Sequence, residues 1–164
     1  MKRAAIALAI ATMLAANGAT ARERLGVWND WGAFRDAAVP RCYAIAMAVD
    51  QPGQRRETQP FFTIANWPRR NIHGEVHMRL SREAAPDKPV VIGIGGQKFA
   101  GLASGFDAWA TDRRADAAII AALRSNGDMT VIARGRDGRS VRDAYHLTGA
   151  ASAMDAASLG CAAS

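Results

Sequence analysis

The chain has 164 residues, of which 49% are hydrophobic, and a formal net charge of +6. This length predicts one domain, large enough for a real hydrophobic core. The positive charge does not form the clustered stripe that nucleic-acid-binding proteins carry, so we expect no nucleic acid among the partners.

The first 21 residues have the three regions of a secretory signal peptide. The basic residues Lys2 and Arg3 follow Met1, a short apolar run covers residues 4–16, and a small-x-small cleavage site lies at residues 19–21. We therefore predict cleavage after Ala21 and a mature chain of residues 22–164 in the periplasm or outside the cell. Of the 21 Lys and Arg residues, two leave with the leader, and the other 19 against 15 acidic residues give a net charge of +4. No later stretch is long and apolar enough to cross a bilayer, which leaves only peripheral contact with a membrane.

Two cysteines occur in the chain, Cys42 near the start of the mature sequence and Cys161 near its end. Neither belongs to a Cys-x-x-Cys pair, the pattern typical of redox-active cysteines. Exported thiol pairs usually oxidise to structural disulfides. We therefore predict a disulfide between Cys42 and Cys161 that joins the first inner strand to the last helix.

Short segments with strand character dominate the chain up to residue 112. Trp28, Trp31 and Phe34 recur at helical spacing, but Gly26 and Gly32 disfavour a helix, so this segment fits either a helix or a strand and turn. Short apolar or alternating runs bounded by Pro or loops predict further strands over residues 42–49, 61–67, 75–80 and 90–94. Residues 97–109 are expected to form two short strands around Gly101 and Gly105.

The last third of the chain predicts two helices with a β-hairpin between them. The first helix covers residues 115–124 and ends at Asn126-Gly127. The hairpin has strands over residues 129–136 and 139–147 with a two-residue Asp137-Gly138 turn. Thr148 precedes an Ala-rich helix over residues 149–159.

Many short strands with two helices predict a mainly β fold. We expect an antiparallel β-sandwich or barrel-like domain with one or two added helices, closed by the disulfide. A doubly wound α/β sheet is disfavoured, because the helical segments do not alternate regularly with the strands.

The chain resembles the invasion-associated locus B family of exported bacterial proteins. The resemblance rests on the signal peptide, the aromatic lead-in at Trp28, Trp31 and Phe34, the run Cys42-Tyr43-Ala44-Ile45-Ala46, Phe99, the pair Ala108-Trp109 and the closing run DAYHLTGAASAMDAASLGC. It implies a β-rich periplasmic or envelope protein with paired cysteines, and it supplies no catalytic residues.

One cluster offers metal-ligand chemistry. His73, Glu75 and His77 alternate along a predicted strand and would share one face of it. With borrowed ligands they could hold a metal ion. The alternative is an exposed polar strand face opposite Val76 and Met78.

A second cluster offers anion binding. Arg134, Arg136, Arg139 and Arg142 surround the predicted hairpin turn, and Arg55-Arg56 and Arg69-Arg70 lie in other loops. Guanidinium groups suit lipopolysaccharide, phospholipid head groups or an acidic partner. The alternative is a solvated turn. Trp67, beside Pro68 and Arg69, is a further surface candidate for binding.

No catalytic set emerges from the sequence. Asp143 and His146 would point to opposite faces of a strand, which disfavours a hydrolytic triad with Ser140. We therefore expect an exported, non-enzymatic module, without a cofactor, that binds an envelope or host component. The alternatives are a periplasmic metal-assisted hydrolase that uses His73, Glu75 and His77, and a sugar- or lipid-binding domain.

Overall fold

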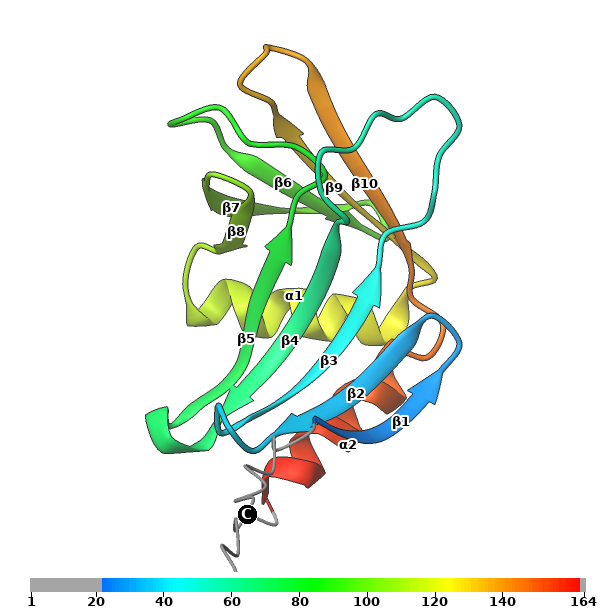
Figure 1. Ribbon diagram of the computed structural model, residues 1–164, viewed down its shortest axis with the longest axis vertical. Coiled ribbons are helices and arrows are strands. Elements are labelled where there is room, and N and C mark those ends of the chain that lie inside the picture. The colour runs from blue at the N-terminus through cyan, green and yellow to red at the C-terminus, as the bar shows by residue number, and fades with distance from the viewer. Residues whose placement is uncertain (1–21, 163–164) are drawn as a thin grey trace, which may run out of the picture.

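The computed structural model describes residues 22–162. The expected signal peptide, residues 1–21, lies outside the described residues. Within the described part, ten strands form one antiparallel sheet, and two helices lie behind its first five strands in the view of Figure 1. The predicted mainly β fold is confirmed.

The elements follow the chain in a simple order. The strands are β1 (Glu23–Trp28), β2 (Trp31–Asp36), β3 (Arg41–Met47), β4 (Phe61–Trp67), β5 (Ile72–Arg79), β6 (Val90–Ile94), β7 (Gln97–Ser104), β8 (Asp107–Ala110), β9 (Asp128–Arg134) and β10 (Ser140–His146). The helices are the short 3₁₀ helix η1 (Pro68–Arg70), α1 (Arg113–Ser125) and α2 (Ala150–Ala162). In space the strands run β1-β2-β3-β4-β5-β8-β7-β6-β9-β10.

The sheet curls so that its two halves meet. The backbone N–H of Val49, just after β3, donates to the carbonyl of Ala144 in β10 at 2.8 Å. The indole N–H of Trp31 in β2 donates to the carbonyl of His146 at 2.9 Å. Strands from opposite ends of the sheet order thus share hydrogen bonds, which gives the domain its barrel-like form.

The inner face of the sheet forms the core. Along β5, the buried side chains of Val76 and Met78 alternate with the half-buried side chains of Glu75 and His77, as a strand with one covered face requires. Helix α2 packs on β1–β4, and α1 packs mainly on β5. The largest fully buried side chains come from strands across the sheet, from the residue just after β5 and from α1: Trp31, Tyr145, Phe62, Met78, Leu80, Ile92, Ile94, Ile119 and Leu123.

The aromatic lead-in forms the β1–β2 hairpin, which settles the alternative that the sequence left open. Asn29 turns the chain with a positive φ of 51°. A Cβ atom on Gly26 would lie 2.3 Å from the Trp28 ring, so the indole needs a glycine at that position. The helical spacing of the aromatic residues is therefore coincidental, and Trp31 alone is completely buried.

Helix α1 is joined to the sheet by polar contacts at its first turn. The Asp112 side chain caps the helix by accepting the N–H of Ala115 at 2.8 Å. One turn on, the Asp116 carboxylate accepts the backbone N–H of Val76 in β5 at 2.9 Å. Burial raises the pKa of the Asp116 carboxyl above its usual range.

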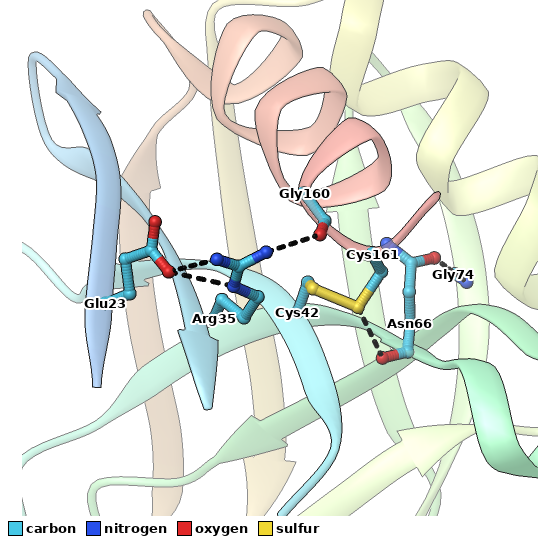
Figure 2. Close-up of a disulfide and its surroundings, with 7 residues drawn as sticks. All are labelled: Glu23, Arg35, Cys42, Asn66, Gly74, Gly160 and Cys161. Carbon is cyan, nitrogen blue, oxygen red and sulfur yellow. Dashed lines mark hydrogen bonds and ion pairs between the residues drawn. A yellow bond between two sulfur atoms is a disulfide. The ribbon is translucent and has the colours of Figure 1, made fainter. Parts of the chain in front are cut away.

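The predicted disulfide is confirmed. Cys42 in β3 and Cys161 in α2 are bonded, with their Cα atoms 5.6 Å apart (Figure 2). Beside them, Arg35 donates to Glu23 at 2.8 Å and to the Gly160 carbonyl at 3.5 Å. The first strands and the last helix are thus joined by one covalent bond and by a polar link.

Candidate anion-binding pocket

A pocket of about 320 Å³ lies between the loop over residues 51–59, the segment after β5 and the start of β10. Four arginines contribute to its wall: Arg55, Arg82, Arg139 and Arg142. The other lining residues are neutral, among them Gln54, Ser81 and Ser140, and no carboxylate lines the pocket. The residues that line the pocket therefore carry a net positive charge.

The buried carboxylate of Asp143 positions the loop over the pocket. Asp143 is fully buried in β10. One of its oxygens accepts the Gln54 side-chain amide at 3.0 Å, and the other accepts the backbone N–H of Ser81 at 2.9 Å. The Gln54 amide also donates to the Arg142 carbonyl at 2.8 Å. One carboxylate thus joins all three segments that form the pocket.

The two neighbouring arginines of the loop have different roles. Arg56 is mostly buried, pairs with Asp50 and donates to the carbonyl of Val49 at 2.5 Å. Arg55, the next residue back, is exposed and forms no ion pair with any described residue. Arg56 therefore anchors the loop, whereas the unpaired guanidinium group of Arg55 contributes its positive charge to the pocket.

Charge compensation in the pocket is uneven. Arg82 forms an ion pair with Glu57 at 3.0 Å and donates to Asp137 at 2.7 Å. Arg139 lies 3.8 Å from the same Asp137 carboxylate. Arg142, like Arg55, has no ion pair among the described residues. Because guanidinium groups stay protonated, two uncompensated positive charges share this pocket.

The four hairpin arginines singled out by the sequence separate into two groups. Arg139 and Arg142 line the pocket. Arg134 donates to the Gly138 carbonyl at 2.5 Å, within the turn, and Arg136 pairs with Glu83 at 2.9 Å. The sequence placed Arg55 in a separate loop and gave no signal for Arg82, because only the folded sheet brings these residues to the hairpin.

The predicted metal ligands do not converge. His73 lies 3.3 Å from the Asn71 side-chain oxygen, Glu75 accepts the Trp67 indole N–H at 3.1 Å, and His77 lies 2.9 Å from Asp107. All three residues lie on the less buried face of β5, opposite Val76 and Met78, but each side chain is held by a different partner. Among residues 22–162, no group of three or more His, Cys, Asp and Glu side chains could hold a metal ion.

Ser140, Asp143 and His146 do not form a catalytic set. Asp143 is fully buried, whereas His146 is exposed and lies 2.9 Å from Asp128 on the neighbouring strand. The carboxylate and the imidazole therefore lie on opposite faces of β10, as the alternation predicted.

Trp67 lies at the end of β4, next to a second, smaller cavity of about 180 Å³. The guanidinium carbons of Arg41 and Arg70 each lie 5.3 Å from its ring centroid.

In the part of the chain that the structure describes, no helix is both long and apolar enough to pass through a bilayer.

No protein-family model matches the chain, and neither a curated protein nor a solved structure matches it at a significant level. The resemblance to the invasion-associated locus B family therefore stays a prediction. The geometry of the pocket provides the basis for a functional proposal.

Proposed function

We propose that this protein is an exported, non-enzymatic binding module of the invasion-associated locus B type, and that its arginine-lined pocket holds an anionic group of an envelope or host component. One observation carries the proposal. Arg55 and Arg142, from a loop and a strand far apart in sequence, face one pocket that no carboxylate lines. Two unpaired positive charges in one pocket repel each other, and an anion bound between them replaces this repulsion with attraction.

The chemistry of guanidinium groups indicates the ligand class. Their planar N–H donors match carboxylate and phosphate oxygens in pairs, and such charge-assisted hydrogen bonds are about twice as strong as neutral ones. Gln54, Ser81 and Ser140 add neutral hydrogen-bonding groups to the same wall. The site can thus bind an anion without a metal ion, a nucleophile or a general base.

The setting supports an exported protein. The expected signal peptide would deliver the chain to an oxidising compartment. Disulfides form and persist in such compartments, and the bond between Cys42 and Cys161 is consistent with this location. We do not propose the metal-assisted hydrolase, because His73, Glu75 and His77 are bonded to three separate partners.

Calorimetric titration of the oxidised mature chain tests this proposal, with pyrophosphate as the phosphate probe and citrate as the carboxylate probe. Replacing Arg55 and Arg142 together by Ala removes both uncompensated charges. Because a hydrogen bond to a charged group contributes about 1.5–3 kcal/mol, we expect affinity to fall at least about tenfold.

The matched control is the double variant Arg134→Ala and Arg136→Ala. It removes the same number of charges, both from the β9–β10 hairpin, and changes no residue that lines the pocket. We expect this control to bind almost as the parent chain does. Equal losses in both double variants, or no binding of either probe by the parent chain, would show that the pocket is not an anion site.

A further inference from the structure

The turn between β2 and β3 has an unusual composition for an exposed turn. Residues 37–40 read Ala-Ala-Val-Pro, and Val39 is 47% exposed. Exposed turns are usually rich in Gly, Asn, Asp and Ser, whose side chains bond to water or to their own backbone. Here the exposed turn carries apolar side chains only.

A second segment extends this apolar surface and adds positive charge. Val39 and Pro40 form a cavity of about 180 Å³ with Trp67, Arg69 and Arg70. Figure 1 shows the β2–β3 turn and η1 at the lower end of the molecule, opposite the loop over residues 51–59 and the β9–β10 hairpin. We call residues 37–40, Trp67, Arg69 and Arg70 the apolar tip.

The charges of the apolar tip are free to meet an external anion. Arg69 and Arg70 are exposed, and neither forms an ion pair with a described residue. No carboxylate lines the cavity. The Glu75 carboxylate accepts the Trp67 indole N–H at 3.1 Å, and Arg70 lies over the ring of this indole. The indole is therefore held in place between the apolar turn and the arginines.

We propose that the apolar tip docks on an anionic phospholipid bilayer. A short apolar turn can enter the head-group region, tryptophan favours the boundary between apolar and polar layers, and arginines attract anionic lipids. This surface lies apart from the anion pocket, so the proposal goes beyond the function given above.

A bilayer explains the tip better than other partners. A free phosphate ion would use the arginines and leave Val39 and Pro40 exposed to water. A stable protein interface involves about 20–30 residues on each side, many more than the tip provides. A bilayer uses the apolar and the cationic residues together and needs only a small contact surface.

Vesicle sedimentation tests the proposal with the oxidised mature chain. We expect binding to vesicles of phosphatidylglycerol and phosphatidylethanolamine, little binding to phosphatidylcholine vesicles, and weaker binding at high salt. The double variant Arg69→Glu and Arg70→Glu reverses two exposed charges and should lower the partition coefficient about tenfold or more. Val39→Asp places a charge on the apolar turn and should also lower it.

The matched control is Arg113→Glu with Arg114→Glu, which reverses another exposed arginine pair at the start of α1. The proposal requires that this control and the Arg55/Arg142 pocket variant keep vesicle binding, while both tip variants lose it and keep the parent circular dichroism spectrum. Absent binding to anionic vesicles, or an equal loss in the control, would overturn it. Loss in the pocket variant alone would assign lipid binding to the pocket instead of the tip.

Discussion

At the scale of single residues, two buried polar side chains on β10 differ in how their hydrogen-bonding capacity is met. Both oxygens of the Asp143 carboxylate have donors from neighbouring segments. The Tyr145 hydroxyl is buried and has no hydrogen-bond partner among residues 22–162. Burial, and then the nearby charge of Asp143, raise the pKa of Tyr145 far above its usual range, so the hydroxyl stays protonated.

Replacing Tyr145 by Phe should leave the domain as stable as before or stabilise it by up to about 1 kcal/mol. A buried polar group without a partner costs free energy, and Phe keeps the ring that packs edge-on against Phe62. Chemical denaturation measures the change. A loss of more than about 1 kcal/mol would mean that the hydroxyl has a stabilising partner.

At the scale of elements, the loop over residues 51–59 depends on β10 for its position. The backbone N–H groups of Glu57 and Thr58 donate to the Ser81 carbonyl at 2.8 and 3.2 Å, and the side chain of Gln54 links the loop to Asp143 in β10. Arg55 reaches the pocket only because this loop is held in place. The fold thus places this loop at the candidate site through the Asp143 carboxylate, the Arg56 anchor and the backbone bonds to Ser81.

The variant Asp143→Asn should be less stable by about 2–3 kcal/mol, because an amide offers one acceptor where two donors converge. It should also weaken pyrophosphate binding, since Arg55 would lose its fixed position. Asp128→Asn provides the control: this carboxylate is exposed, and its change should cost less than about 1 kcal/mol. Denaturation and calorimetry give the two readouts, and a fully stable Asp143→Asn protein would contradict the anchoring role.

At the scale of the whole molecule, the disulfide links the first strands to the last helix. Cys42 and Cys161 are separated by 119 positions in the sequence, so the bond closes nearly the whole described chain into a loop. Helix α2 also buries Ala153, Met154 and Ala157 against the sheet. Covalent and hydrophobic contacts therefore act on the same interface.

Replacing both cysteines by serine should lower the free energy of unfolding by up to roughly 5 kcal/mol, because the open unfolded chain gains entropy. The expected decrease in melting temperature is roughly 10–20 °C. Calorimetry of the oxidised parent and the double variant measures it. A change of a degree or two would show that α2 packing alone holds the termini together.

Local sequence patterns were sufficient to predict much of the secondary structure. Residues 61–67 and 90–94 form strands with the predicted bounds, since short apolar runs between Pro, Gly and loops have few other stable conformations. The helix predicted over residues 115–124 is observed from Arg113 to Ser125, so its bounds were predicted to within two residues. The disulfide was predictable because only one pairing of two cysteines exists. These features depend on neighbours in sequence or on simple counting.

The remaining features depend on contacts between distant parts of the chain. The lead-in at Trp28 and Trp31 was compatible with a helix or a hairpin until pairing with β3 selected the hairpin. The place of β8 beside β5, and not beside β9, is likewise a matter of long-range pairing. Arg55, Arg82 and Arg142 share a pocket only after the sheet curls and Asp143 captures the loop. Periodicity determines which side of a segment is buried, but only the packed sheet decides which surfaces meet.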